Sequence, residues 1–143
     1  MKKLLLLVFL AGLAWTTGSC VKKEKCPEPE VWAVGTWKVS KIVDNGQVVD
    51  LTTSPGSCKA QGTIRLDDNH TGEWNYFYVS GGNCTVQVYP VDAWSENLKK
   101  NEIYITGPFY IFGIQYTFKG LYLNDHTFRL PYSNNSYMEF TKQ

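Results

Sequence analysis

Turn-forming residues recur along this chain at short intervals, and they separate stretches in which apolar and polar residues alternate. The turn signals lie at 44–46, 54–56, 67–69, 80–83, 107–108, 124–125 and 133–135. Many short strands at such spacing are typical of an all-β sandwich or barrel. Connections this short cannot carry the crossovers of parallel strands, so the sequence predicts an antiparallel sheet.

The alternation of side chains predicts where the strands lie. We expect strands at 35–43, 59–66, 72–79, 84–89, 102–106, 110–118, 126–131 and 136–141, with shorter ones at 47–51 and 92–96. Aromatic residues make up 15% of the chain, and they favour half-buried pleated surfaces. Residues 34–143 are therefore predicted to form one all-β domain, an antiparallel meander of about eight to ten strands.

The first twenty residues have the pattern of a bacterial export signal. Lys2 and Lys3 precede an apolar run at 4–14, and small residues then lead to Cys20. The run is shorter than the roughly 20 residues of a membrane-spanning helix, so cleavage is expected. The ending resembles the bacterial lipobox, with Thr17 in place of the usual aliphatic residue. This resemblance implies a lipoprotein signal peptide at 1–19 and acylation of Cys20. The alternative is an ordinary secretion signal in which Cys20 is incidental.

Residues 20–33 are predicted to be a flexible tether, because they are charged, contain two prolines and show no period. An acylated cysteine carries the two or more chains that stable membrane anchoring needs. We therefore expect a cell-envelope protein attached to the outer membrane, on a face that the sequence leaves open. The fourteen basic and thirteen acidic side chains form no basic stripe, which argues against nucleic acid as a partner.

The remaining cysteines bear on the disulfide framework, because an exported chain meets an oxidising compartment. We predict a Cys58–Cys84 disulfide, since both residues lie at loop–strand junctions of the expected domain, whereas Cys26 lies in the tether. The pairings Cys26–Cys58 and Cys26–Cys84 are the alternatives. With the predicted pair formed, Cys26 is a free thiol or an intermolecular link.

At Gly35 and Trp37 the chain resembles the lipocalins, which open their first barrel strand with Gly-x-Trp and use this Trp to plug the closed end. The later features follow in an order similar to that of small lipocalin-like domains in Bacteroidetes lipoproteins: the turn at 44–46, then 64–72, 94–105 and the closing strand 137–142. The resemblance covers residues 34–142 and implies a meander closed into a small barrel. It also implies an Arg129–Trp37 stack, the alternative being a solvated arginine.

The resemblance further implies non-catalytic binding of a small apolar or amphipathic ligand inside the barrel. Two alternating strands supply the candidate lining side chains, which are Trp74, Tyr76, Tyr78, Phe112, Ile114, Tyr116 and Phe118. Their apolar bodies and few polar tips fit the composition of ligand pockets. The alternative is that these rings only fill the interior of a small barrel.

No constellation for catalysis, a metal or a cofactor is evident. The chain lacks a nucleophile motif, and His70 and His126 lie in turn sequences without a second ligand nearby. We therefore expect no enzymatic activity and no cofactor. The main alternative function is an envelope interaction module with a filled barrel core, which docks a protein partner through exposed aromatics such as Tyr104 or Tyr122.

Overall fold

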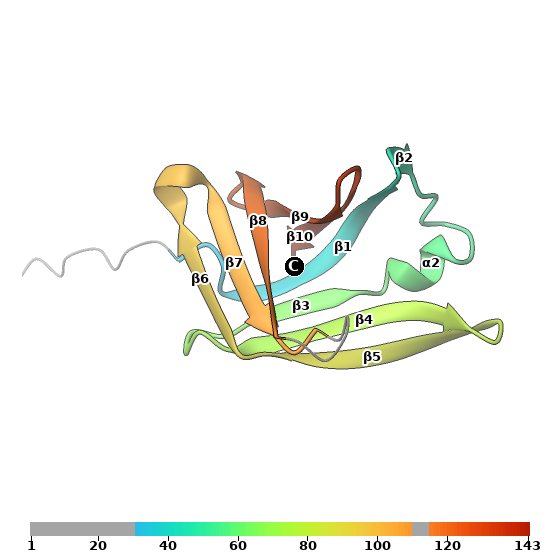
Figure 1. Cartoon of the computed structure of the whole chain (residues 1–143), viewed down its shortest axis with the longest axis horizontal. Coiled ribbons are helices and arrows are strands. Elements are labelled where there is room, and N and C mark those ends of the chain that lie inside the picture. The colour runs from blue at the N-terminus through green and yellow to red at the C-terminus, as the bar shows by residue number, and fades with distance from the viewer. Residues whose placement is uncertain (1–30, 110–114) are drawn as a thin grey trace, which may run out of the picture. The chain divides into compact units, whose positions relative to one another are not determined.

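The computed structural model describes residues 31–109 and 115–143, and Val31–Gln143 form one compact unit (Figure 1). Its described strands are β1 (Gly35–Asp44), β2 (Gln47–Val48), β3 (Thr63–Leu66), β4 (Gly72–Ser80), β5 (Asn83–Val91), β6 (Ala93–Asn97), β7 (Glu102–Gly107), β8 (Tyr116–Asn124), β9 (Thr127–Ser133) and β10 (Ser136–Lys142). The α-helix α2 (Gly56–Lys59) and the 3-10 helix η2 (Leu98–Lys100) are short. No helix in this part of the chain has both the length and the apolar character needed to cross a bilayer.

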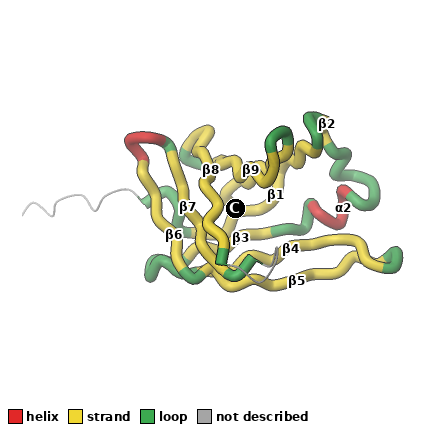
Figure 2. Tube along the Cα trace, in the orientation of Figure 1, coloured by secondary structure: helices red, strands yellow, loops and turns green. Residues whose placement is uncertain are grey.

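The strands form a single antiparallel sheet that curls back on itself. Their order is β5-β4-β3-β1-β10-β9-β8-β7-β6, with β2 paired to β1, and Figure 2 shows strands along most of the trace. The two edge strands, β5 and β6, are consecutive in sequence. Between them the Asp92 N–H donates to the Thr106 carbonyl of β7 at 2.9 Å. The sheet is therefore a nearly closed barrel, which confirms the predicted fold class.

A glycine makes the close approach of the two sheet margins sterically feasible. A Cβ atom at Gly107 of β7 would lie 2.4 Å from the carbonyl oxygen of Pro90 in β5 and 2.9 Å from the ring of Phe109. Real Cβ atoms do not approach so closely, so no larger residue fits without moving β7 away from β5. This contact between β5 and β7 is the closing seam of the barrel.

The predicted strand at 59–66 was wrong in its first half. Residues Gly56–Lys59 form α2, and β3 begins only at Thr63. The N–H groups of Ala60 and Gly62 donate to carbonyls of this helical turn, at 2.9 and 3.0 Å. The backbone there is satisfied locally and needs no strand partner.

The strand predicted at 110–118 continues further than expected. Strand β8 runs from Tyr116 to Asn124, while residues 110–114 lie outside the described residues. The half at 119–124 was not predicted because Gly120 interrupts the apolar period on the inward face. A Cβ atom at this position would lie 2.6 Å from the Leu130 side chain and 2.8 Å from that of Ile103, so a larger residue requires these side chains to move.

The core begins earlier in the chain than predicted. Ala33, which the sequence analysis assigned to the tether, is fully buried, as are Trp37, Phe128 and Phe140. The rings of Trp37 and Phe128 lie 4.7 Å apart between centroids, and those of Phe128 and Phe140 5.2 Å. The segment before β1 therefore packs into one end of the barrel.

Candidate functional site

A cavity of about 310 Å³ lies inside the curled sheet. Its wall is formed by side chains from β1, α2, β4, β5, β8, β9, β10 and the segment after β7. They are Asp44, Lys59, Trp74, Tyr76, Tyr89, Phe109, Phe118, Leu130, Tyr132 and Met138. The barrel core is thus not completely filled by its own side chains.

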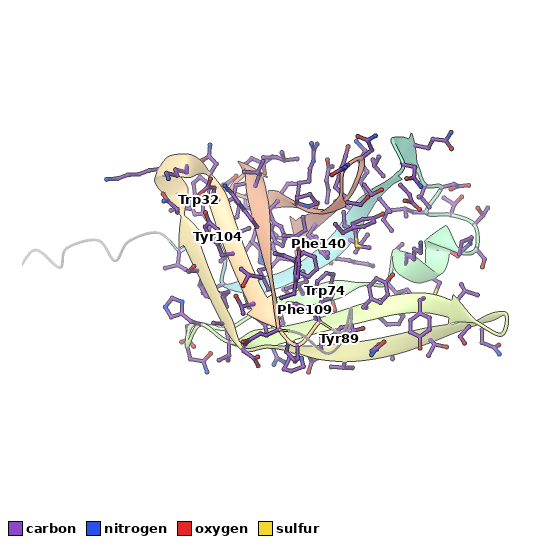
Figure 3. All side chains as sticks on the ribbon, in the orientation of Figure 1. Trp32, Trp74, Tyr89, Tyr104, Phe109 and Phe140 are labelled. Carbon is purple, nitrogen blue, oxygen red and sulfur yellow. A yellow bond between two sulfur atoms is a disulfide. The ribbon has the colours of Figure 1, made fainter. Side chains whose placement is uncertain are left out.

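Trp74 is the centre of the aromatic part of this wall. Its ring meets those of Phe109 and Phe118 edge-on, with centroids 5.1 and 5.4 Å apart. Phe140 lies 6.2 Å from it, and Figure 3 shows Trp74, Phe109 and Phe140 gathered in the interior. Edge-to-face pairs stabilise such clusters beyond area burial alone, so this part of the wall is well fixed.

Polar groups form another part of the cavity wall. Asp44, the last residue of β1, accepts a hydrogen bond from the Ser136 hydroxyl at 3.1 Å. Burial, and secondarily the charge of Asp44, raises the pKa of Tyr76 and of Tyr132. Burial also raises the pKa of Tyr89. These hydroxyls remain protonated near neutral pH. Tyr132 donates its proton to the Val43 carbonyl at 3.1 Å, whereas Tyr76 and Tyr89 are able to donate hydrogen bonds into the cavity.

A β-bulge explains why Asp44, although exposed to solvent, borders the cavity. The pairing of β1 with β10 shifts register between Val39 and Lys41, so one extra residue changes the side to which later side chains point. Trp37 and Val39 point inward before the bulge, and Ile42 and Asp44 do so after it. Simple alternation from Trp37 places Asp44 outside, which is why sequence reasoning missed it.

Lys59 is positioned by the disulfide. Cys58 of α2 is bonded to Cys84 of β5, the pair favoured from the sequence, and this bond ties α2 to the β4–β5 hairpin. Lys59 follows Cys58 directly and lines the cavity. It forms no ion pair with any residue in the described ranges, so its ammonium group is available to a bound molecule.

The structure brings together three of the seven predicted lining residues: Trp74, Tyr76 and Phe118. Tyr78 stacks on Tyr76 with centroids 6.2 Å apart but does not line the cavity. Tyr116 packs against Phe118 at the start of β8 and is 54% exposed. Phe112 and Ile114 lie outside the described residues.

Seven lining residues were missed, and the reasons differ. Tyr89, Leu130 and Met138 lie on predicted strands, but a single strand does not reveal which interior residues border a void. Phe109 follows a turn signal, Gly107-Pro108, and was assigned to no strand. Tyr132 lies just beyond the predicted end of its strand, and Lys59 lies in α2, at the start of the strand predicted at 59–66.

The Gly-x-Trp motif closes one end of the barrel. Trp37 is fully buried and donates its indole N–H to the Ala33 carbonyl at 2.7 Å. Gly35 has φ +134° and lies against Lys142, whose ammonium group is 5.5 Å from the centre of the Trp37 ring. The positive φ, which side chains rarely adopt, explains the glycine of the motif.

The expected Arg129–Trp37 stack was wrong. Arg129 points to the outer face of β9, where its guanidinium lies 4.0 Å from the centre of the Tyr137 ring and pairs with Glu139 at 2.7 Å. Lys142 occupies the cationic position over Trp37 instead. The alternation of β9 explains the difference, because Phe128 and Leu130 on either side of Arg129 are the buried residues.

Glu96 holds the N-terminal segment against this closed end. Its carboxylate accepts the N–H groups of Trp32 and Ala33, both at 3.2 Å, and the Tyr122 hydroxyl at 2.9 Å. Tyr122 was expected to be an exposed docking residue, but it is only 5% exposed. Its burial, the Glu96 charge and this hydrogen bond raise its pKa above the usual value.

No group of three or more metal-ligating side chains occurs within residues 31–109 and 115–143. The arrangement offers an apolar cavity with a few polar groups in its wall.

One comparison, with a protein-family model, agrees with this architecture. A family model described as a lipocalin-like domain matches residues 34–130. Among solved structures, an uncharacterized protein from Bacteroides eggerthii DSM 20697 is similar, with 15% sequence identity and a TM-score of 0.46 over 78% of this chain and 99% of that chain. No match was found among curated proteins.

Proposed function

Because this chain belongs to the family of lipocalin-like domains, we propose that its barrel binds a small apolar or amphipathic molecule without converting it chemically. The observation that carries the proposal is the cavity of about 310 Å³ between the aromatic wall and the polar groups. Pockets that bind small molecules start at about 300 Å³ and combine apolar walls with a few placed polar groups.

The cavity volume limits the size of the ligand and its affinity. A water molecule takes about 30 Å³ in the liquid, so the cavity holds roughly ten water-sized groups. Burial of about 200 Å² of apolar ligand surface contributes about 5 kcal/mol before ordering costs. That free energy corresponds to weak binding, with dissociation constants of about 0.1 mM or above for apolar burial alone.

The anchor is the second part of the proposal. The lipobox-like ending before Cys20 supports a diacyl or triacyl anchor that holds the barrel at the outer membrane. Intact-mass analysis of the N-terminal peptide from membrane fractions is expected to find acyl chains on Cys20, and Cys20→Ser is expected to release the protein from the membrane. An unmodified Cys20 on a membrane-free protein would remove the anchor and leave the binding proposal standing.

Docking of a protein partner by a filled barrel is the competing function, and the size of the cavity favours ligand binding over it. An exposed apolar surface suited to docking lies on the outer face of β5, where Val86 and Val88 are 45% and 53% exposed. We expect the double variant Val86→Thr/Val88→Thr to leave ligand binding unchanged.

Native mass spectrometry of protein purified from its own cells tests the binding proposal. We expect one small molecule bound per barrel in the wild type. Met138→Phe places a ring in the cavity and should deplete this bound mass, whereas Val88→Thr on the outer face should retain it. A bare wild-type barrel, or a bound mass unaffected by Met138→Phe, would contradict binding in the cavity.

A further inference from the structure

One buried hydrogen-bond donor beside the cavity has no partner in the described part of the chain. The indole nitrogen of Trp74 is shielded from solvent and bonds to no acceptor among the described residues, although the side chain is only 8% exposed. Two other buried indoles in the domain are satisfied: Trp37 donates to Ala33 at 2.7 Å and Trp94 to the Asp67 carbonyl at 2.9 Å. Because buried N–H groups are nearly always paired, Trp74 is the exception that calls for an explanation.

No acceptor among the described residues reaches the Trp74 indole N–H. The rings of Phe109, Phe118 and Phe140 around it offer no acceptor, and Lys59 is a donor only. Asp44 and the tyrosine hydroxyls of the cavity wall can accept hydrogen bonds, but none of them is bonded to this indole. A molecule in this cavity therefore meets an unused donor at Trp74.

We infer that Trp74 donates its indole N–H to an acceptor oxygen carried by the bound molecule. This inference rests on the proposed ligand-binding function and specifies the class of ligand: a compact apolar molecule with a carbonyl or similar acceptor on its buried part. A pure hydrocarbon of the same shape leaves the N–H unpaired and binds less well. Trp74 therefore selects ligands by their acceptor oxygen as well as by their shape.

Two probes of matched shape test this assignment: 2-acetonaphthone carries a ketone oxygen, and the hydrocarbon 2-isopropenylnaphthalene carries a CH2 group in its place. Their affinities are measured by calorimetric or fluorescence titration for the wild type, for Trp74→Phe and for Trp94→Phe. Trp94→Phe is the matched control, because it removes an indole that does not line the cavity. Comparing the ratio of the two affinities between proteins cancels the different water solubilities of the probes.

We expect Trp74→Phe to reduce the ratio of ketone to hydrocarbon affinity roughly tenfold relative to the wild type. A change of this size corresponds to the free energy of one hydrogen bond from a buried donor. Trp94→Phe is expected to keep the wild-type ratio. An unchanged ratio in Trp74→Phe would overturn the role of the indole while leaving ligand binding intact. Failure of both probes to bind the wild type would reject the proposed function itself, and this inference with it.

A measurement on the wild type covers the case in which Trp74→Phe does not fold. In the ¹H–¹⁵N spectrum, the assigned Trp74 indole signal should move downfield when the ketone binds and should not do so with the hydrocarbon. An indole signal that responds alike to both probes would refute the hydrogen bond.

Discussion

Tryptophan side chains at different positions of this barrel have different roles. Trp37 is fully buried, hydrogen-bonded to Ala33 and covered by Lys142, so it closes the barrel end. Trp74 is nearly as buried but borders a cavity, and its N–H has no acceptor within residues 31–109 and 115–143. The difference lies in the neighbours that the fold brings to each ring.

We therefore expect the indole N–H of Trp37 to raise the free energy of unfolding and that of Trp74 to lower it. Trp37→Phe breaks a buried hydrogen bond and leaves the Ala33 carbonyl without its donor, at a cost of about 1–3 kcal/mol beyond lost packing. Trp74→Phe removes an unsatisfied donor, so its loss of unfolding free energy should be smaller by a similar amount. Urea unfolding of the two ligand-free variants measures this. An equal or larger loss for Trp74→Phe would mean that its N–H is satisfied in the free protein.

At the scale of elements, the closing seam, the disulfide-linked helix and the N-terminal segment hold the barrel in shape. Gly107→Ala tests the seam, because the added methyl group would meet the Pro90 carbonyl at 2.4 Å and the Phe109 ring at 2.9 Å. We expect a loss of about 2 kcal/mol or more, in the range of overpacked cores, and weaker ligand binding. Gly81→Ala is the control, since its added methyl group meets nothing within 4 Å; it should cost about 1–2 kcal/mol through its positive φ and leave binding unchanged.

The disulfide prediction concerns α2. Reduction, or the double variant Cys58→Ser/Cys84→Ser, opens a loop with a sequence separation of 26. The chain-entropy model gives about 3.5 kcal/mol for a loop of this length. We also expect weaker ligand binding, because α2 carries Lys59 to the cavity wall. Equal ligand affinity in the oxidised and reduced protein would show that the position of Lys59 does not depend on the bond.

The N-terminal segment gives a prediction for alkaline pH. The folded state raises the pKa of Tyr122 above its unfolded value near 10, so this residue's contribution to stability is complete below about pH 10 and is lost as the pH rises further. Tyr122→Phe should lower stability at neutral pH, because Glu96 loses one of its donors. It should also flatten the fall in stability above pH 10. An alkaline profile identical to that of the wild type would contradict the Tyr122–Glu96 interaction.

At the scale of the whole molecule, the sequence predicted the kind of fold better than the site. Alternation and turn spacing were sufficient for an antiparallel meander, since each strand carries its own period. They did not reveal the bulge that turns Asp44 inward, the helical turn at Cys58, or the void beside Trp74. Those features depend on register and on contacts between strands that are far apart in sequence.

The central claim is that a small molecule occupies the cavity inside the barrel, and Met138 reports on it directly. It is the only methionine of the chain besides Met1, and it lines the cavity. Protein labelled with ¹³C at the methionine methyl group should show a saturable shift of the Met138 signal on titration with 2-acetonaphthone. A Met138 signal that does not move up to the solubility limit of this probe, in a folded protein, would contradict binding in the cavity.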